Sequence, residues 1–364
     1  MSQVSGGETV PLLGPTAEPG TADVLRLPRL ARHSIELPDG HHVGVAVCGQ
    51  GVPFVLVHGF SAEGMLYAQA LWRLVDLGFK VVAIDTAGHG ATQGLPTGGR
   101  DFSAYTDLLD RVLDALGIEQ AVFAGHSMGG RLVTELAAAR PERVISVILV
   151  DAIVGQTWDR LVWLSRFWPP VLGGVAAILV VDTLSTIPLF RDRSQAVKLG
   201  RLVAPTLLGH VRRPWRLFGP AVSIIRSPGS GPMLDKIRLA RLPLFAVHGD
   251  RDIVVPLATG RDAARRAAGE LVVVHGATHS WVLKDPESMP AIVHELMKGR
   301  LGTAVLKARL NAGLDGDADR AEINANRAFY AEDSLAVALT PRQEWHDEEK
   351  FHRAPRYRWH REST

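Results

Sequence analysis

One run of small residues around a serine is the most informative part of this chain: Ala124-Gly125-His126-Ser127-Met128-Gly129-Gly130. The apolar run 121–123 before it predicts a strand, and the pattern over 131–139 after it predicts a helix. A side chain at Gly125 or Gly129 would collide with neighbouring backbone in a sharp turn. The pattern G-x-S-x-G therefore indicates a strand-to-helix turn that presents a serine hydroxyl.

Composition narrows the class of protein. The 364 residues include 40 Lys or Arg and 38 Asp or Glu, a formal net charge of +2, which gives no reason to expect a nucleic-acid partner. Cys48 is the single cysteine, so no intrachain disulfide is expected. The longest apolar run, 167–181, is interrupted by proline and glycine pairs and is too short for a comfortable membrane span. We expect a cytoplasmic protein whose residues 1–32 form a flexible lead-in without a signal peptide.

Apolar runs alternate with helical patterns through most of the chain. A hairpin is predicted around Pro38-Asp39-Gly40, and buried strands are predicted at 53–57, 80–84, 121–123, 144–150, 243–248 and 270–275. Helices are predicted between these strands, including 104–116 with Ser103 as its cap. The alternation predicts an α/β protein with a mainly parallel central sheet and helices on both faces.

The alternation of strand and helix patterns stops after Asp151. Residues 153–240 contain Trp and Pro clusters and helical stretches but no strand series, and predict a helical cap inserted after the sixth strand. Residues 33–152 and 241–299 then form the core. The charged extension 301–364, with a helix expected over 321–339, either packs on the core or mediates association. Asp315, Asp317 and Asp319 resemble the start of a calcium loop, but Asn326 stands where the loop needs Glu, so no metal site is predicted.

A serine needs a base, an acid and an anion hole before it can act as a nucleophile. His279 is the best candidate for the base because it lies in a loop just after the last strand, whereas His248 and His275 end strands themselves. The acid follows in the loop His248-Gly249-Asp250-Arg251-Asp252, which offers Asp250 and Asp252, with Asp151 a more distant alternative. These groups occur in the order Ser, acid, His that accompanies this turn.

Backbone N–H groups can stabilise the oxyanion that forms during acyl transfer. Met128 is expected to supply one because it follows the nucleophile at a helix N-terminus. Phe60 is expected to supply the second because His58-Gly59-Phe60 follows a buried strand. The alternative is that these three residues form only a tight turn.

Five motifs in order resemble the α/β-hydrolase superfamily over residues 33–299, in its serine esterase, lipase and cofactor-free haloperoxidase-like branch. They are His58-Gly59-Phe60, Asp85-Thr86-Ala87-Gly88-His89-Gly90, Gly125-His126-Ser127-Met128-Gly129, the 248–256 loop with Asp252, and Gly276-Ala277-Thr278-His279. The resemblance implies that Asp252 is the acid, that no cofactor is needed, and that Asp85 and Gly88 to Gly90 shape a loop. Thr92 stands where such proteins commonly have Ser.

The cap suggests what reaches the nucleophile. Its aromatic residues, with Trp281 beside the base, are candidates for a substrate pocket: Trp158, Trp163, Phe167, Trp168 and Trp281. Between residues 185 and 230 the chain also carries eight Lys or Arg and one acid, Asp192. These basic residues either face an anionic lipid surface, as in a peripheral membrane protein, or form an ordinary solvated face.

These features favour a serine hydrolase that cleaves carboxylic esters with apolar acyl or alcohol groups through an acyl-enzyme on Ser127. Two alternatives stay open. The same triad could hydrolyse a carbon-carbon bond, or the fold could be kept by a non-catalytic ligand-binding receptor. The sequence indicates a small-molecule ester or lipid substrate and leaves the oligomeric state undefined.

Overall fold

A computed structural model describes residues 24–28, 30–60, 62–96, 99–168, 214–339, 345–349 and 354–362, with isolated positions between 169 and 213. Within these ranges, every helix is too short or too polar to cross a lipid bilayer. Most of the apolar run 171–181 and most of the basic cap residues lie outside the described residues.

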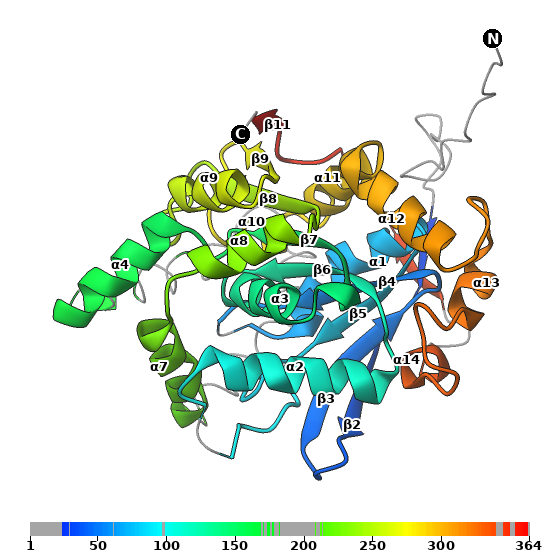
Figure 1. The fold of residues 1–364 in the computed structure, drawn as a ribbon, viewed down its shortest axis with the longest axis horizontal. Coiled ribbons are helices and arrows are strands. Elements are labelled where there is room, and N and C mark those ends of the chain that lie inside the picture. The colour runs from blue at the N-terminus through cyan, green and yellow to red at the C-terminus, as the bar shows by residue number, and fades with distance from the viewer. Residues whose placement is uncertain are drawn as a thin grey trace.

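A mostly parallel sheet of nine described strands forms the centre of the molecule (Figure 1). Its order is β11-β9-β8-β7-β6-β4-β5-β3-β2. The pairs β2–β3, β3–β5 and β11–β9 are antiparallel, and the others are parallel. The strands are β2 (Ala31–Glu36), β3 (His42–Cys48), β4 (Val52–Val57), β5 (Phe79–Ile84), β6 (Ala121–His126), β7 (Val144–Val150), β8 (Leu244–Gly249), β9 (Glu270–Val274) and β11 (Trp359–Glu362).

Helices cover both faces of this sheet, as the apolar character of its central strands requires. On one face α2, α3, α8 and α9 pack in sequence, and on the other α1 packs against α11 and α11 against α12. The bounds are α1 (Ala68–Asp76), α2 (Phe102–Leu116), α3 (Met128–Ala139), α8 (Gly231–Leu239), α9 (Leu257–Arg266), α11 (Ser288–Met297) and α12 (Arg300–Asn311). Short helices η1 (Gly64–Tyr67), η2 (Pro141–Arg143) and α10 (Trp281–Lys284) join them. The expected α/β class is confirmed.

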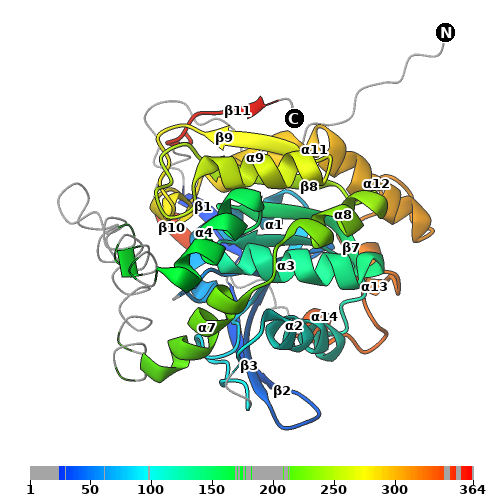
Figure 2. The same cartoon turned by 60° about the vertical axis from the view of Figure 1, so that its left-hand side comes forward.

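The insertion begins after β7, the sixth strand of this sheet in chain order, as expected. Its described helices are α4 (Gln156–Phe167), η3 (Pro214–Leu217), α7 (Phe218–Arg226) and α8. Figure 2 shows α4 and α7 at one side of the molecule, on the far side from α12. The helix α8 belongs with the core layer instead of the cap, because Leu234 and Ile237 are buried in the main hydrophobic cluster.

The chain ends depart from expectation. Residues 24–28 form β1 (Val24–Pro28), which pairs with β10 (Trp345–Glu349), and Ala31 and Arg32 already belong to β2. The predicted lead-in 1–32 therefore contains strands. A continuous helix over 321–339 is wrong: α13 (Arg320–Ala325) ends at Asn326, which has extended backbone, and α14 (Leu335–Ala338) starts later.

Two helix starts have local causes that the sequence analysis did not find. Asp101 caps α2 by accepting a hydrogen bond from the Ser103 N–H, so the helix begins at Phe102 instead of Ala104. Asp319 and Glu322 form a capping box at α13. Asp319, one of the three acidic residues that resembled a calcium loop, is therefore a helix cap.

The C-terminal extension packs on the core. The Tyr330 hydroxyl donates to the Gly51 carbonyl oxygen at 2.6 Å, and Asn324 accepts from the Gly51 N–H at 3.2 Å, at the start of β4. Lys80 on β5 donates to the Ala336 carbonyl at 3.4 Å. The last strand, β11, extends the sheet beside β9. The packing alternative for residues 301–364 thus has direct structural support.

The Tyr330 bond yields a stability prediction. Tyr330→Phe keeps the ring but leaves the buried Gly51 carbonyl without this donor, so we expect the free energy of unfolding to fall by about 1–3 kcal/mol. Urea denaturation measures the change. Arg327→Gln, which removes an exposed ion pair with Glu332 in the same extension, is the matched control and should lower it by less than about 1 kcal/mol. Equal effects of the two substitutions would contradict the anchoring role of Tyr330.

Candidate active site

The turn at Ser127 is tight and strained. Ser127 lies between β6 and α3 with φ of 52° and ψ of −115°, a backbone conformation that residues other than glycine rarely adopt. A Cβ on Gly125 would lie 2.4 Å from the Gly129 carbonyl oxygen, and a Cβ on Gly129 would lie 2.1 Å from that of Val57. Only glycine fits at either position, which confirms the predicted reason for the small residues.

Hydrogen bonds continue the sheet into the loops at its carboxyl edge. The Ser127 N–H donates to the Val150 carbonyl, Asp151 N–H to that of Val247, and Asp250 N–H to that of Val274, at 2.9, 3.0 and 3.0 Å. The loops after β6, β7, β8 and β9 are therefore held in register at one edge. The nucleophile, acid and base candidates lie in the loops after β6, β8 and β9, respectively.

The structure brings His279 and Asp252 together. The two side chains are buried, and His279 Nδ1 donates to Asp252 Oδ2 at 2.7 Å. The other carboxylate oxygen, Oδ1, accepts the N–H groups of Val254 and Val255, each at 2.8 Å. His279 Nε2 is buried and has no hydrogen-bond partner among the described residues. One ring nitrogen is thus oriented by the acid, and the other is left to exchange a proton.

The pKa values of two neighbouring carboxyl groups, Asp151 and Asp252, are shifted in opposite directions. Asp151 is fully buried, and its pKa is raised well above the usual range by burial and by the charge of Asp252. Burial also acts to raise the pKa of Asp252, but His279 and hydrogen bonds outweigh it and the pKa is lowered. Asp151 accepts from Gly249 N–H at 2.8 Å and from Trp281 Nε1 at 2.5 Å. It therefore supports the loops instead of orienting His279.

The alternative residues form a separate pair. Asp250 Oδ2 lies 3.0 Å from His275 Nδ1, and both side chains are substantially exposed. His248 is buried, and its Nε2 donates to the Val255 carbonyl at 2.8 Å. His248 Nε2 also lies 3.7 Å from Asp252 Oδ2, but its hydrogen is given to Val255, so His279 makes the hydrogen bond to this oxygen.

The two candidate oxyanion donors, Met128 and Phe60, occupy backbone positions suited to that role. Met128 is the first residue of α3, so its N–H has no intrahelical acceptor. His58 Nε2 accepts from the Thr86 N–H at 2.9 Å, which leaves Nδ1–H to donate to the Gly59 carbonyl at 2.8 Å. Because C=O and N–H of one trans peptide point in opposite directions, this bond also fixes the Phe60 N–H.

The loop after β5 has the shape that the sequence motif implied. The Asp85 carboxylate accepts from the N–H groups of Gly64 and Ala91, at 2.8 and 3.1 Å, and Gly88 and Gly90 have positive φ values. The Thr92 hydroxyl donates to the Asp85 carbonyl at 2.6 Å. The loop uses a hydroxyl at this position, which threonine supplies as serine would.

The family model Hydrolase_4, described as serine aminopeptidase S33, matches residues 53–287 and so spans all of these loops. The chain belongs to this α/β-hydrolase family. A protein of Mycobacterium phage D29 that carries the provisional name non-heme haloperoxidase is 32% identical over 71% of this chain and 92% of its own. This α/β-hydrolase is therefore an enzyme of the esterase, lipase and haloperoxidase-like group.

Two further similarities agree with this assignment. A monoacylglycerol lipase of Mycolicibacterium smegmatis is 26% identical over 64% of this chain and 82% of its own. The crystal structure of the esterase RhEst1 from Rhodococcus sp. ECU1013 superposes with a TM-score of 0.56 at 22% identity, covering 74% of this hydrolase and 98% of the esterase. The second similarity concerns the fold alone.

In the described part of this hydrolase, the predicted pocket aromatics lie in two different environments. Trp158 and Trp281 are buried, at 5% and 0% exposure, and belong to the hydrophobic core. Trp163, Phe167 and Trp168 are 59%, 69% and 63% exposed on and just after α4. The Trp281 indole packs on Tyr357 and donates to Asp151, and a role of Trp281 in a substrate pocket stays a prediction.

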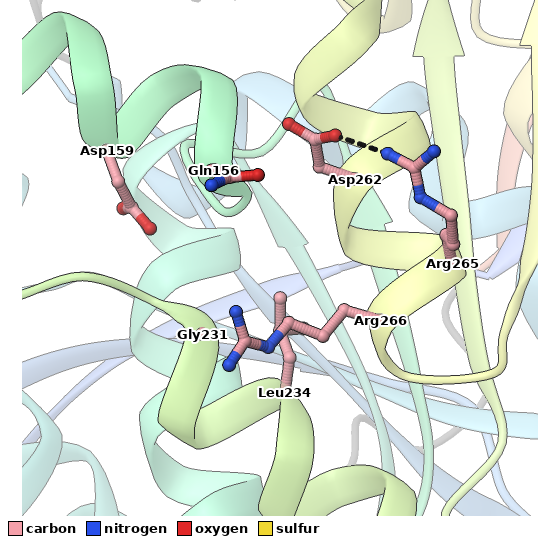
Figure 3. Close-up of a pocket in the computed structure, with 7 residues that line it drawn as sticks. All are labelled: Gln156, Asp159, Gly231, Leu234, Asp262, Arg265 and Arg266. Carbon is pink, nitrogen blue, oxygen red and sulfur yellow. Dashed lines mark hydrogen bonds and ion pairs between the residues drawn. The ribbon is translucent and has the colours of Figure 1, made fainter.

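A cavity of about 190 Å³ lies away from these loops, between α4, α8 and α9 (Figure 3). Its charged groups have protein partners: Asp262 with Arg265 at 2.8 Å, Arg266 with Asp235 at 2.7 Å, and Asp159 with Ser230 at 2.8 Å. It contains no nucleophile beside a base and therefore does not compete as the active site. Its lining residues are Gln156, Asp159, Gly231, Leu234, Asp262, Arg265 and Arg266.

One group of described side chains has the spacing of metal ligands: Asp151, His248 and Asp252. The hydrogen bonds given above already use the oxygens of both carboxylates and His248 Nε2. The group therefore forms part of the hydrogen-bonded support behind His279.

Sequence reasoning missed two residues that contact the catalytic loops. Tyr67 ends η1 and carries no motif signal. His126 occupies an x position of the G-x-S-x-G pattern, which specifies no residue type there. A histidine directly before the serine was the one sequence signal that could have identified it. Their hydrogen bonds are Tyr67 Oη to His126 Nδ1 at 2.8 Å and His126 Nε2 to the His279 carbonyl at 3.0 Å.

The two aspartates of one loop provide a matched test of the acid. Asp252→Asn should lower kcat for a short p-nitrophenyl ester by about 10³- to 10⁴-fold, because the amide no longer stabilises the imidazolium or fixes its tautomer. Asp250→Asn alters a similar pair at the surface and should change kcat by less than about twofold. Initial-rate kinetics on the folded variants decide the point. A larger loss from Asp250→Asn would transfer the acid role to that residue.

Proposed function

We propose that the protein is a serine hydrolase that cleaves carboxylic esters through an acyl-enzyme on Ser127. The observation that carries the proposal is His279, which donates to Asp252 through Nδ1 and keeps a buried, unbonded Nε2 at the sheet edge that holds Ser127. His33 and His41 also have a buried Nε2 without a hydrogen-bond partner among the described residues. His279 differs from them because its Nδ1 donates to a buried carboxylate, which can stabilise a proton taken up at Nε2.

The proposed reaction begins with proton transfer. His279 Nε2 accepts the Ser127 hydroxyl proton while Oγ forms a bond to the ester carbonyl carbon. The carbonyl oxygen becomes an oxyanion, which the N–H groups of Met128 and Phe60 stabilise, and the Asp252 carboxylate stabilises the imidazolium.

The tetrahedral intermediate then expels the alcohol, which takes the proton from His279. Water attacks the acyl-enzyme by the same route, with His279 again as base. Cleavage of the acyl bond to Ser127 releases the carboxylic acid and returns the proton to Oγ, so the enzyme is unchanged after one turnover.

The outer side of α4 supports a preference for apolar esters. Arg160, Trp163, Leu164 and Phe167 are exposed at positions that share one helical face, and the rings of Trp163 and Phe167 lie 5.0 Å apart. Tryptophan and phenylalanine beside arginine are typical of surfaces that lie at a lipid–water boundary. We therefore propose that the enzyme binds substrates with apolar acyl or alcohol groups at a lipid surface.

Chemical labelling separates this function from its alternatives. Ser127→Ala should abolish turnover of p-nitrophenyl esters and labelling by a fluorophosphonate, whereas Ser103→Ala, an exposed serine in α2, should change neither. Mass spectrometry locates the label. Failure of folded wild-type protein to react would favour a ligand-binding receptor. Labelling without ester turnover, but with cleavage of a β-diketone, would favour carbon-carbon bond hydrolysis.

The lipid-surface part has its own test. The double variant Trp163→Ser/Phe167→Ser should bind vesicles of phosphatidylglycerol and phosphatidylcholine at least about tenfold more weakly than wild type, since two aromatic rings no longer enter the interface. Leu239→Ser, which removes an apolar side chain that is 77% exposed on α8, is the matched control and should bind as wild type does. Cosedimentation measures binding, and equal affinities of the three proteins would contradict this part.

A further inference from the structure

A buried hydrogen-bond chain connects the turn at the nucleophile with the backbone of the base. Tyr67 and His126 are 2% and 5% exposed. His126 is the last residue of β6, directly before Ser127, and its ring centroid lies 4.9 Å from that of His279 and 5.8 Å from that of Tyr67. The residue before the nucleophile therefore stands between a tyrosine of η1 and the catalytic histidine.

The chemistry of the partners fixes the direction of each bond. The His279 carbonyl oxygen can only accept, so His126 Nε2 must carry the hydrogen of the 3.0 Å bond. A neutral imidazole then has its lone pair at Nδ1, which accepts from the Tyr67 hydroxyl at 2.8 Å. Burial, followed by the nearby His279, lowers the pKa of His126 to about 3, so the ring stays neutral at ordinary pH. A neutral ring also avoids repelling the imidazolium that forms on His279.

The same tyrosine touches the oxyanion loop. Burial raises the pKa of the Tyr67 phenol, and a hydrogen bond from the Gly59 backbone acts in the opposite direction. A Cβ at Gly59 would lie 2.8 Å from His126 Nδ1 and 3.1 Å from Ser127 Cβ, so the loop that carries Phe60 packs directly on this pair. Tyr67 and His126 thus contact the loops that carry Phe60, Ser127 and His279.

Water cannot readily replace the His126 donor. Beneath Tyr67 and His126 lies a cavity of only about 10 Å³, whose other walls include Leu71, Val150 and Val282. A buried water needs two or more polar partners, and every lining residue other than Tyr67 and His126 is apolar. Without the His126 N–H, the His279 carbonyl would be left without this partner, and the backbone of the base would be free to shift.

We propose that His126 and Tyr67 are positioning residues: His126 holds the backbone carbonyl of His279 so that its Nε2 stays aligned with Ser127, and Tyr67 holds His126 in the required tautomer. This role rests on the proposed serine-hydrolase function, since alignment matters only if His279 accepts the serine proton. Asp252 orients the imidazole through Nδ1, and His126 orients the main chain that carries it. A misplacement of about 1 Å can lower a rate about 100-fold.

Two substitutions of similar size test the bond at His126. Glutamine places an amide N–H near the position of Nε2, whereas methionine has a similar length and no donor. His126→Gln should keep kcat within about threefold of wild type, and His126→Met should lower kcat about 10- to 100-fold with KM changed by less than about twofold. Tyr67→Phe should lower kcat about 3- to 10-fold, because the tautomer is no longer fixed.

The readout is the rate at which a fluorophosphonate phosphonylates Ser127, measured beside ester kinetics and thermal unfolding of each variant. This rate depends on the base but not on ester preference. The labelling rate should fall in His126→Met and be restored in His126→Gln at similar melting temperatures. Equal rates in the two variants, or a loss of rate that only follows a loss of stability, would overturn the proposal.

The two proposals fail in different ways. If wild-type protein is labelled but cleaves no ester, the ester-hydrolase function fails while the labelling rates of the variants still decide the positioning role. If wild-type protein is not labelled at Ser127 at all, both are overturned.

Discussion

A serine side chain at the left-handed turn between β6 and α3 is the constraint on which the site depends. The conformation of Ser127, with φ of 52°, is of a kind that costs about 1–3 kcal/mol. Surrounding contacts must offset this cost, and three backbone hydrogen bonds do so: Ser127 N–H to Val150, and the N–H groups of Gly130 and Ile153 to the Ser127 carbonyl. The turn is therefore stable only within the completed sheet, with β4 and β7 on either side of β6.

The other groups of the proposed catalytic site are fixed through the main chain as much as through their side chains. His58 holds the carbonyl of the peptide that carries the Phe60 N–H, and Val254 and Val255 hold the Asp252 carboxylate. His279 is held through its ring by Asp252, and its carbonyl accepts from His126. Preorganised donors of this kind need no rearrangement when charge develops, which is the main electrostatic contribution in acyl transfer.

The sequence predicts the core well because its signals are local and periodic. Strands β4 to β9 are continuous apolar runs buried on both faces, and the loops after them carry motif residues at fixed positions. Other features depend on contacts that no local pattern records. Asp250 and Asp252 could not be separated from spacing alone, because each has its own histidine, and the choice rested on resemblance until the 2.7 Å contact with His279 was seen.

Long-range contacts also decide the surroundings of Trp281 and the interruption of the helix expected over 321–339. Trp281 follows the base and so suggested a pocket wall, but the direction of its side chain is set by Asp151 and Tyr357, which are 130 and 76 positions away in the chain. The helix expected over 321–339 is interrupted where the segment turns back to place Tyr330 on Gly51. Tertiary contacts override local helix propensity in this segment.

The contacts of the extension have a consequence for the order of events during synthesis. Gly51 precedes β4, a strand in the middle of the sheet, and its carbonyl accepts from the Tyr330 hydroxyl. Tyr330 is synthesised 279 residues after Gly51. At about 5–20 residues per second, the ribosome needs roughly 15 to 55 s to cover that interval. During this time the nascent sheet lacks its last partners, and β9 keeps an open edge until residues 359–362 emerge. The sheet is therefore complete only after β11 has been made, and until then the unpaired edge of β9 is exposed to aggregation.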